Sequence, residues 1–113
     1  MDRLNTYRAL VRKVICSSPY FVHGSVGPNV ETQFLGDDAN ARYLLVDIGW
    51  RGKERVFKPI LYVCIKQEKI WIEEDWTEDG IAEELMRLGV PKEDIVLAFH
   101  HPKLRPYTDF AVA

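Results

Sequence analysis

The side chains best suited to chemistry are the adjacent histidines His100 and His101, near the end of the chain. Imidazole is the commonest metal ligand in proteins, and it titrates near neutral pH. Neighbouring residues of an extended segment point in opposite directions, so both could bind one ion only at an unusual turn. Pro102 could supply the turn and His23 a third nitrogen, but no ligand spacing connects them. We therefore predict no metal site.

Acidic residues gather before the second predicted helix, at Glu73, Glu74, Asp75, Glu78 and Asp79. Such a cluster could hold a hard cation, yet the spacing is not that of an EF-hand loop. Carboxylates also stabilise the positive end of a helix dipole. We interpret the cluster as a corner between a strand and a helix.

No pattern for a catalytic nucleophile or a nucleotide cofactor is present: the chain lacks GxSxG, a P-loop and GxGxxG. Cys16 falls at a helix end and Cys64 in a strand, where small buried hydrophobic residues are expected. The sequence thus predicts a protein that is not an enzyme, without catalytic residues or cofactors. Because there is no CxxC pair and no apolar leader in MDRLNTYRALVRKV, we expect a cytoplasmic protein that does not enter a membrane.

Charge argues against general nucleic-acid binding, because 15 Lys and Arg face 17 Asp and Glu, a net charge of −2. A local basic patch can still bind phosphate on such a protein. The candidate nucleic-acid contacts surround one turn, at Arg51, Lys53, Arg55 and Lys58. An ordinary solvated surface carries basic residues in the same pattern, and no helix-turn-helix, zinc-finger or RNP pattern is visible. Both readings stay open.

These residues must be positioned by a single domain, residues 1–113, since this length suits one hydrophobic core. Apolar residues at helical spacing predict an N-terminal helix over residues 3–16, with Asp2 as its cap. Ser17, Ser18 and Pro19 end the helix. Glycines and prolines then predict a loop from Tyr20 to Asn29.

Four strand patterns follow with short, turn-like connections, which predicts an antiparallel meander. A second helix is expected before Gly89, starting at Asp75, as part of a capping box, or at Thr77. We therefore predict an α+β fold with a mainly antiparallel sheet of about five strands, an N-terminal helix and a second helix before the last main strand. The predicted strands cover residues 30–35, 41–50, 56–65, 70–73 and 95–99.

Both faces of the central strands look apolar, whereas a sheet with one wet face should alternate apolar with polar residues. Alternation places Phe57 with Leu61, and Pro59 predicts a bulge or an edge position. Some of the large residues must lie under a helix or form a patch for a partner. The candidate partner interface is Tyr43, Leu45, Tyr62, Trp71 and Trp76.

Nearly the whole chain resembles the XisI family of fdxN element excision controlling factors, best represented in cyanobacteria. The resemblance is carried by IGWRGKERV at 48–56, by KIWIEEDWTEDGIAEELMRLGVPKEDIVLAFHHP at 69–102 and by TDFAVA at 108–113. It departs from the family pattern at Tyr62 and Cys64, where His and Asp are frequent, and at Glu68, where a turn glycine is frequent. Trp76 also replaces a frequent glycine.

The resemblance implies a controlling factor for excision of a DNA element during heterocyst differentiation. The chemistry on the DNA strands is left to a site-specific recombinase complex, and a XisH-like sister controlling factor is the expected partner. Our leading hypothesis is a non-enzymatic accessory protein that acts through protein contacts, with DNA contacted only indirectly. Two alternatives are an adaptor or inhibitor of a nuclease-like partner and a directionality factor that binds DNA directly. A homo-oligomer also stays open.

Overall fold

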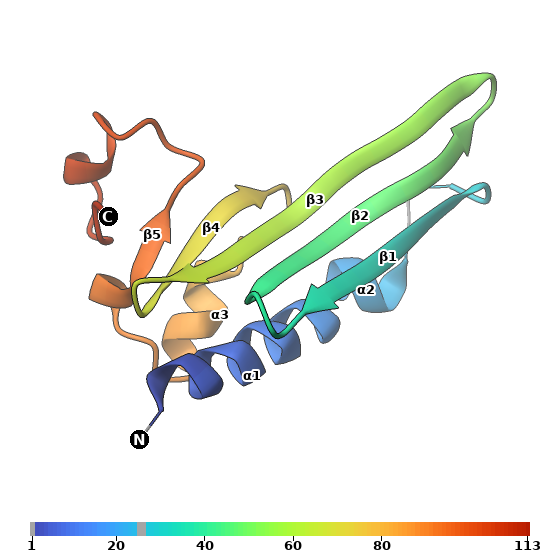
Figure 1. Ribbon diagram of the computed structural model, residues 1–113. Coiled ribbons are helices and arrows are strands. Elements are labelled where there is room, and N and C mark those ends of the chain that lie inside the picture. Colours follow the sequence, from blue (N-terminus) through green and yellow to red (C-terminus); the bar gives the residue numbers. More distant parts are fainter. Residues whose placement is uncertain (1, 25–26) are drawn as a thin grey trace.

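The computed structural model describes residues 2–24 and 27–113, which form one five-stranded sheet and three α-helices (Figure 1). The strand order is β1-β2-β3-β4-β5; the first four strands are antiparallel neighbours, and β5 runs parallel to β4. The predicted α+β architecture is therefore confirmed. The elements are α1 (Arg3–Cys16), α2 (Pro19–His23), β1 (Val30–Asp37), β2 (Arg42–Arg51), β3 (Glu54–Lys66), β4 (Lys69–Asp75), α3 (Ala82–Arg87) and β5 (Ile95–Leu97), with short 3₁₀ turns at Lys92–Asp94 and Arg105–Tyr107.

Helix α1 has the predicted bounds and the predicted cap, because the Asp2 carboxylate accepts the N–H of Asn5 at 3.3 Å. The predicted loop from Tyr20 is wrong for Tyr20–His23, which continue as α2. Pro19 stands in the first turn of α2, where a missing N–H costs nothing, and Ser18 caps it. Of the remaining predicted loop, residues 25 and 26 lie outside the described residues.

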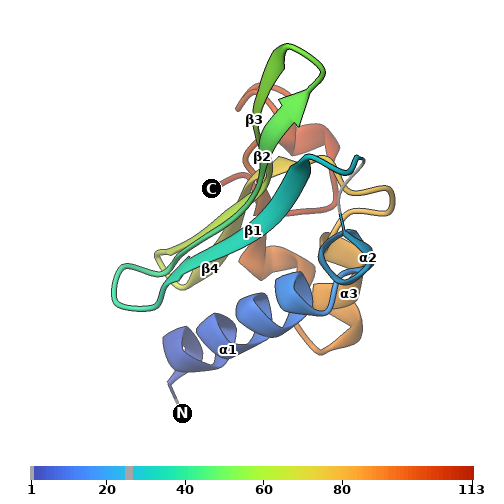
Figure 2. The same ribbon diagram turned by 90° about the vertical axis from the view of Figure 1, so that its right-hand side faces the viewer.

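The three helices lie on the same side of the sheet and bury one of its faces (Figure 2). Apolar burial on this side supplies most of the folding free energy. The largest fully buried side chains of this core come from α1, α3 and all the strands except β1: Ile15, Tyr43, Leu45, Leu61, Ile70, Ile72, Leu85 and Ile95.

Strand β3 contains the bulge that Pro59 predicts. The β2 residues that pair with Pro59 and Leu61 are consecutive, so Ile60 is an extra residue in β3. One extra residue reverses the alternation of side chains between the two faces. Phe57 therefore lies on the opposite face from Leu61, and the predicted grouping of these two residues is wrong.

Helix α3 is shorter than predicted, and neither predicted start is correct. The Asp75 carboxylate instead accepts the N–H of Thr77 at 2.9 Å and the N–H of Ile81 at 2.8 Å. These bonds hold the intervening residues in a turn, so the helix begins only at Ala82. The predicted stop is confirmed, since Gly89 follows the helix with a positive φ of 104°.

Three tyrosine hydroxyls donate hydrogen bonds to carboxylates, and two of these bonds connect distant segments. The pairs are Tyr7 with Asp94, Tyr20 with Asp47 at 2.5 Å and Tyr43 with Asp38 at 2.8 Å. Burial, and then the hydrogen bond to the carboxylate, raise the pKa of each tyrosine from 10.0 to about 12. The hydroxyls thus stay protonated where an exposed tyrosine ionises.

The turn between β3 and β4 carries a mild strain. Gln67 and Glu68 both have positive φ, 53° and 63°, as a two-residue type I′ turn requires. Glycine adopts this conformation freely, whereas in other L-residues it costs conformational free energy. Glu68→Gly should raise the free energy of unfolding by about 0.5 kcal/mol, measured by urea denaturation. The Arg3–Glu68 ion pair that it removes is exposed and worth little.

Glu83→Gly is the matched control, because Glu83 lies in the first turn of α3. There the same change should lower stability by about 0.5–1 kcal/mol. A loss of stability in Glu68→Gly as large as in the control would contradict the turn argument.

Candidate interaction surface

The face of the sheet opposite the helices presents apolar side chains from three neighbouring strands. Because Leu45 and Leu61 point into the helix-covered core, their chain neighbours Leu44 and Tyr62 point to the other side. Leu35 pairs with Leu44, and Leu44 pairs with Tyr62. These residues form a continuous cross-strand row on β1, β2 and β3.

A second row lies closer to the β2–β3 turn, where Ile48 pairs with Phe57. Val46 and Pro59 pair between the two rows. Leu35 is 53% exposed and Phe57 is 64% exposed, unusually high values for residues of these types in strands. We call this surface the open face and define it by Leu35, Leu44, Ile48, Phe57 and Tyr62.

The structure divides the five residues of the predicted partner interface. Tyr43 and Leu45 are completely buried in the core with α1, so the prediction is wrong for these two: a partner cannot reach them in the folded chain. Tyr62 lies on the open face and is half-buried. Trp71 lies on β4, on the same side of the sheet as Tyr62, because it pairs with Cys64, and Trp76 lies just beyond the end of β4.

Trp71 is covered by the chain itself. The guanidinium of Arg105 lies 5.7 Å from the centre of the indole, and the Lys66 ammonium lies 4.2 Å from it. Arg105 also donates hydrogen bonds to the carbonyls of Ala98 and His100, at 3.2 and 3.1 Å. This arginine therefore fastens the C-terminal segment over β4, and Trp71 serves as its platform.

The paired histidines have local contacts. His101 Nδ1 accepts the N–H of Lys103 at 3.1 Å, and the His100 ring lies 4.6 Å from the ring of Phe99. Across residues 2–24 and 27–113, no group of three or more His, Cys, Asp and Glu side chains is placed to hold a metal ion.

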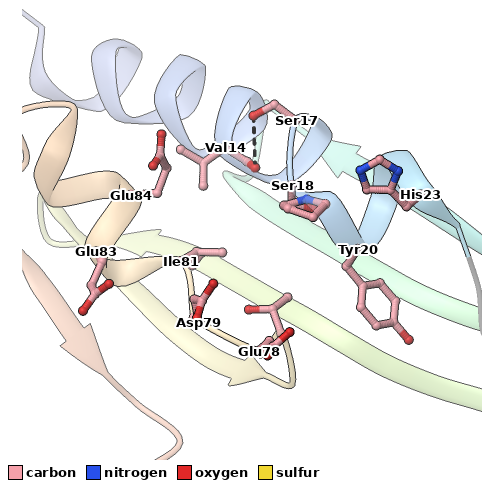
Figure 3. Close-up of a pocket in the computed structure, with 13 residues that line it drawn as sticks. Val14, Ser17, Ser18, Tyr20, His23, Glu78, Asp79, Ile81, Glu83 and Glu84 are labelled. Carbon is pink, nitrogen blue, oxygen red and sulfur yellow. Dashed lines mark hydrogen bonds between the residues drawn. The ribbon is translucent and has the colours of Figure 1, made fainter.

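A cavity of about 680 Å³ opens between the end of α1, α2 and the segment that leads into α3 (Figure 3). Glu78, Asp79 and Glu83 line it together with Tyr20 and His23. The first three belong to the predicted acidic corner or follow it directly. Since all three carboxylate side chains are exposed, the corner presents negative charge to solvent.

The predicted nucleic-acid contacts lie on and beside the β2–β3 turn, at the far end of the longest strands (Figure 1). Two aromatic rings accompany them: the Arg55 guanidinium lies 5.2 Å from the centre of Trp50, and Lys58 Nζ lies 4.2 Å from that of Trp76. All four basic side chains are exposed: Arg51, Lys53, Arg55 and Lys58.

A buried carboxylate lies at the base of this hairpin. Asp47 accepts a hydrogen bond from the hydroxyl of Tyr20 at 2.5 Å and another from that of Thr32 at 2.6 Å. Its two partners come from α2 and β1, so Asp47 ties α2 and the edge strand β1 to β2. A buried charge needs such donors to be tolerated.

Sequence reasoning missed Leu35 and Phe57 as surface residues. For Phe57 a signal existed: a bulge at Pro59 reverses the alternation, and applying it would have moved Phe57 to the exposed face. For Leu35 no local signal exists, because its exposure depends on all three helices packing on the other side of the sheet.

Comparison with known proteins gives consistent results. The family model described as XisI protein matches residues 1–112. The chain is similar to the crystal structure of a XisI-like protein from Anabaena variabilis ATCC 29413, with 36% identity, a TM-score of 0.89 and coverage of 97% of this chain and 99% of that one. It is also similar to the crystal structure of the fdxN element excision controlling factor XisI from the same organism, with 40% identity, a TM-score of 0.89 and coverage of 99% and 100%. No curated protein matches the chain. None of the described helices has the length and apolar character needed to span a bilayer.

Proposed function

Because the chain belongs to the XisI family, we propose that it is a non-enzymatic accessory factor that controls excision of a DNA element through contacts with other proteins. The proposed partners are a XisH-like sister controlling factor and the site-specific recombinase complex, in the cytoplasm of a cyanobacterium undergoing heterocyst differentiation. One of the two similar crystal structures is itself an fdxN element excision controlling factor.

The observation that carries the proposal is the open face. It combines an aromatic residue, Phe57, with the aliphatic Leu35 on neighbouring strands of a rigid sheet, and both are more than half exposed. Burying one such side chain against a partner contributes about 1.5–3 kcal/mol. Aromatic anchors surrounded by apolar neighbours are typical of binding hot spots.

The serine and threonine hydroxyl groups have hydrogen bonds that shape the backbone. In the part of the chain that the structure describes, no serine, threonine or cysteine side chain hydrogen-bonds to a histidine, the arrangement that activates a nucleophile. Most of the hydrogen bonds of these groups go to backbone carbonyls or to carboxylates, where they shape turns and helix ends.

The test is the double variant Leu35→Ser and Phe57→Ser, titrated calorimetrically against the purified sister factor. Each truncation removes one exposed apolar contact, so affinity should fall at least about 100-fold. Excision of the element in cells that carry only this variant should be lost in parallel. Serine adds no charge, so electrostatic attraction is unchanged.

Val22→Ser with Leu104→Ser is the matched control, because both residues are similarly exposed but lie in α2 and in the C-terminal segment. The control should bind like wild type. Equal affinity of the open-face variant and wild type would refute the open face as the contact. If the protein binds the sister factor but excision of the element does not require the protein, an adaptor or inhibitor role is favoured.

A further inference from the structure

The β2–β3 hairpin projects beyond the rest of the sheet as a two-stranded ribbon (Figure 1). Strand β1 pairs with β2 only as far as Gly49, and β4 pairs with β3 only as far as Leu61. Beyond these points, Trp50 pairs with Arg55 and Arg51 pairs with Glu54, and the described residues place no third strand on either side. We call this tip, residues 50–55, together with the neighbouring Lys58 the ribbon, and we propose that it binds duplex DNA by entering the major groove.

This inference goes beyond the proposed function, which uses protein contacts only. Its first support is charge. The ribbon carries four cationic side chains and a single anionic one, Glu54, a net charge of +3 on a chain whose total is −2. Within the described residues, none of the four cations takes part in an ion pair. Their charge is therefore available to an anionic partner.

The arrangement of the cations on the ribbon is the second support. Arg55 lies on the open-face side with Phe57. Lys58 pairs with Asp47, and Arg51 is in phase with Asp47 along β2, so both lie on the helix-facing side. A ribbon in the major groove has a phosphate chain along each of its sides. Cations on both faces of the ribbon can approach both phosphate chains, whereas cations on a single flat surface would approach only one.

A hollow of about 420 Å³ beside the hairpin is lined by parts of Arg51, Arg55 and Lys58. Asp47 and Glu54 also line it, which leaves a net charge of +1, and the Asp47 carboxylate is already engaged by Tyr20 and Thr32. Three cations around one hollow offer charge-assisted hydrogen bonds to phosphate oxygens, and arginine can bind them in a bidentate manner.

Shape supports duplex DNA rather than duplex RNA. The major groove of B-form DNA is about 12 Å wide and admits a two-stranded ribbon, whereas that of A-form RNA is too narrow for side chains to enter. Trp50 and Trp76 hold two of the cations by ring contacts, which orient these side chains without neutralising their charge.

The experiment is fluorescence anisotropy with a labelled 30-base-pair DNA duplex of mixed sequence, titrated with the full chain at about 50 mM NaCl. We expect micromolar binding by wild type. The double variant Arg51→Gln and Lys53→Gln should weaken binding at least about tenfold and reduce the slope of log K against log salt by about 2. Arg55→Gln with Lys58→Gln is an independent second variant that should show the same loss.

Lys13→Gln with Lys103→Gln is the control, since it removes the same charge from exposed residues of α1 and the C-terminal segment. It should bind DNA like wild type, and a duplex RNA of equal length should bind wild type at least about tenfold more weakly. The proposal is overturned if wild type does not bind DNA at about 100 µM protein, if the control loses as much as the hairpin variants, or if RNA binds equally. Circular dichroism confirms that each variant is folded.

Discussion

Raising the pH from 10 to 12 should remove a large part of the protein's stability, because three tyrosines hold their protons in the folded state and lose them when it unfolds. The pKa of Tyr7, Tyr20 and Tyr43 is raised from 10.0 to about 12 by burial and by a hydrogen bond to a carboxylate. Below pH 10 both states are protonated and the stabilisation is complete. Between pH 10 and 12 these three tyrosines lose their protons mainly in the unfolded state, so stability falls as pH rises.

At pH 11 the two states differ by about 2.5 protons over the three tyrosines, which corresponds to a slope of about −3 kcal/mol per pH unit. Each tyrosine thus contributes about 2 kcal/mol that disappears by pH 12. Since the total stability of a small domain is about 5–15 kcal/mol, the protein should unfold within this interval. Urea denaturation at a series of pH values, followed by circular dichroism, gives the slope directly, and tyrosinate absorbance counts the protons.

Tyr20→Phe is the variant that isolates one of the three groups. It should flatten the slope by one proton and lower stability at pH 7, because Asp47 loses one of its two donors. Tyr107→Phe is the control, since the Tyr107 ring is 88% exposed and its hydroxyl has no hydrogen-bond partner among the described residues. A slope in Tyr20→Phe identical to that of wild type would show that Tyr20 does not hold its proton in the folded state.

The elements of this fold could be predicted because they depend on nearby residues. The spacing of Tyr7, Val11 and Val14 predicts α1, and turn residues separate the strands of the meander. Local signals also misled: Asp75 resembles a helix cap, but its carboxylate reaches Ile81 and delays the helix start. The path of the backbone after Asp75 therefore decides which N–H groups its carboxylate can accept.

The candidate surface was only partly predictable because exposure is decided by long-range packing. Tyr43 and Tyr62 look alike in the sequence, yet the first lies under the helices and the second faces away from them. The pairing of Tyr7 with Asp94 joins residues 87 positions apart, which no local pattern can indicate. The basic turn was found because its four cations are close together along the chain.

The two proposed contact regions are built on the same pair of strands. The hairpin and the open face are parts of the same β2 and β3 strands, and the Asp47 carboxylate connects β2 to α2 and β1 at the point where the hairpin leaves the sheet. A partner on the open face and DNA on the hairpin would therefore be held in a fixed relative orientation. This is the property an accessory factor needs in order to place a partner on a DNA site.

Gly49 lies at that same point, and Gly49→Ala should destabilise the protein by about 3 kcal/mol. A Cβ at this position would overlap the carbonyl oxygen of Asn29 and lie 2.7 Å from Cα of Val30. These are backbone atoms, and the Asn29 carbonyl is fixed further by the N–H of Trp50 at 3.0 Å. The added methyl group must therefore force β1 and β2 apart. Thermal denaturation should show a midpoint lowered by about 10–20 °C.

Gly27→Ala is the matched control for this steric argument, because a Cβ at Gly27 meets no atom of the described residues within 4 Å, its chain neighbours aside. The same methyl group should change stability there by less than about 0.5 kcal/mol. If Gly49→Ala were as stable as this control, β1 and β2 would have to separate at no cost, and the close approach of Asn29 could not be what fixes the base of the hairpin. Loss of DNA binding in a folded Gly49→Ala protein would instead show that the orientation of the hairpin, and not only its charge, determines the affinity.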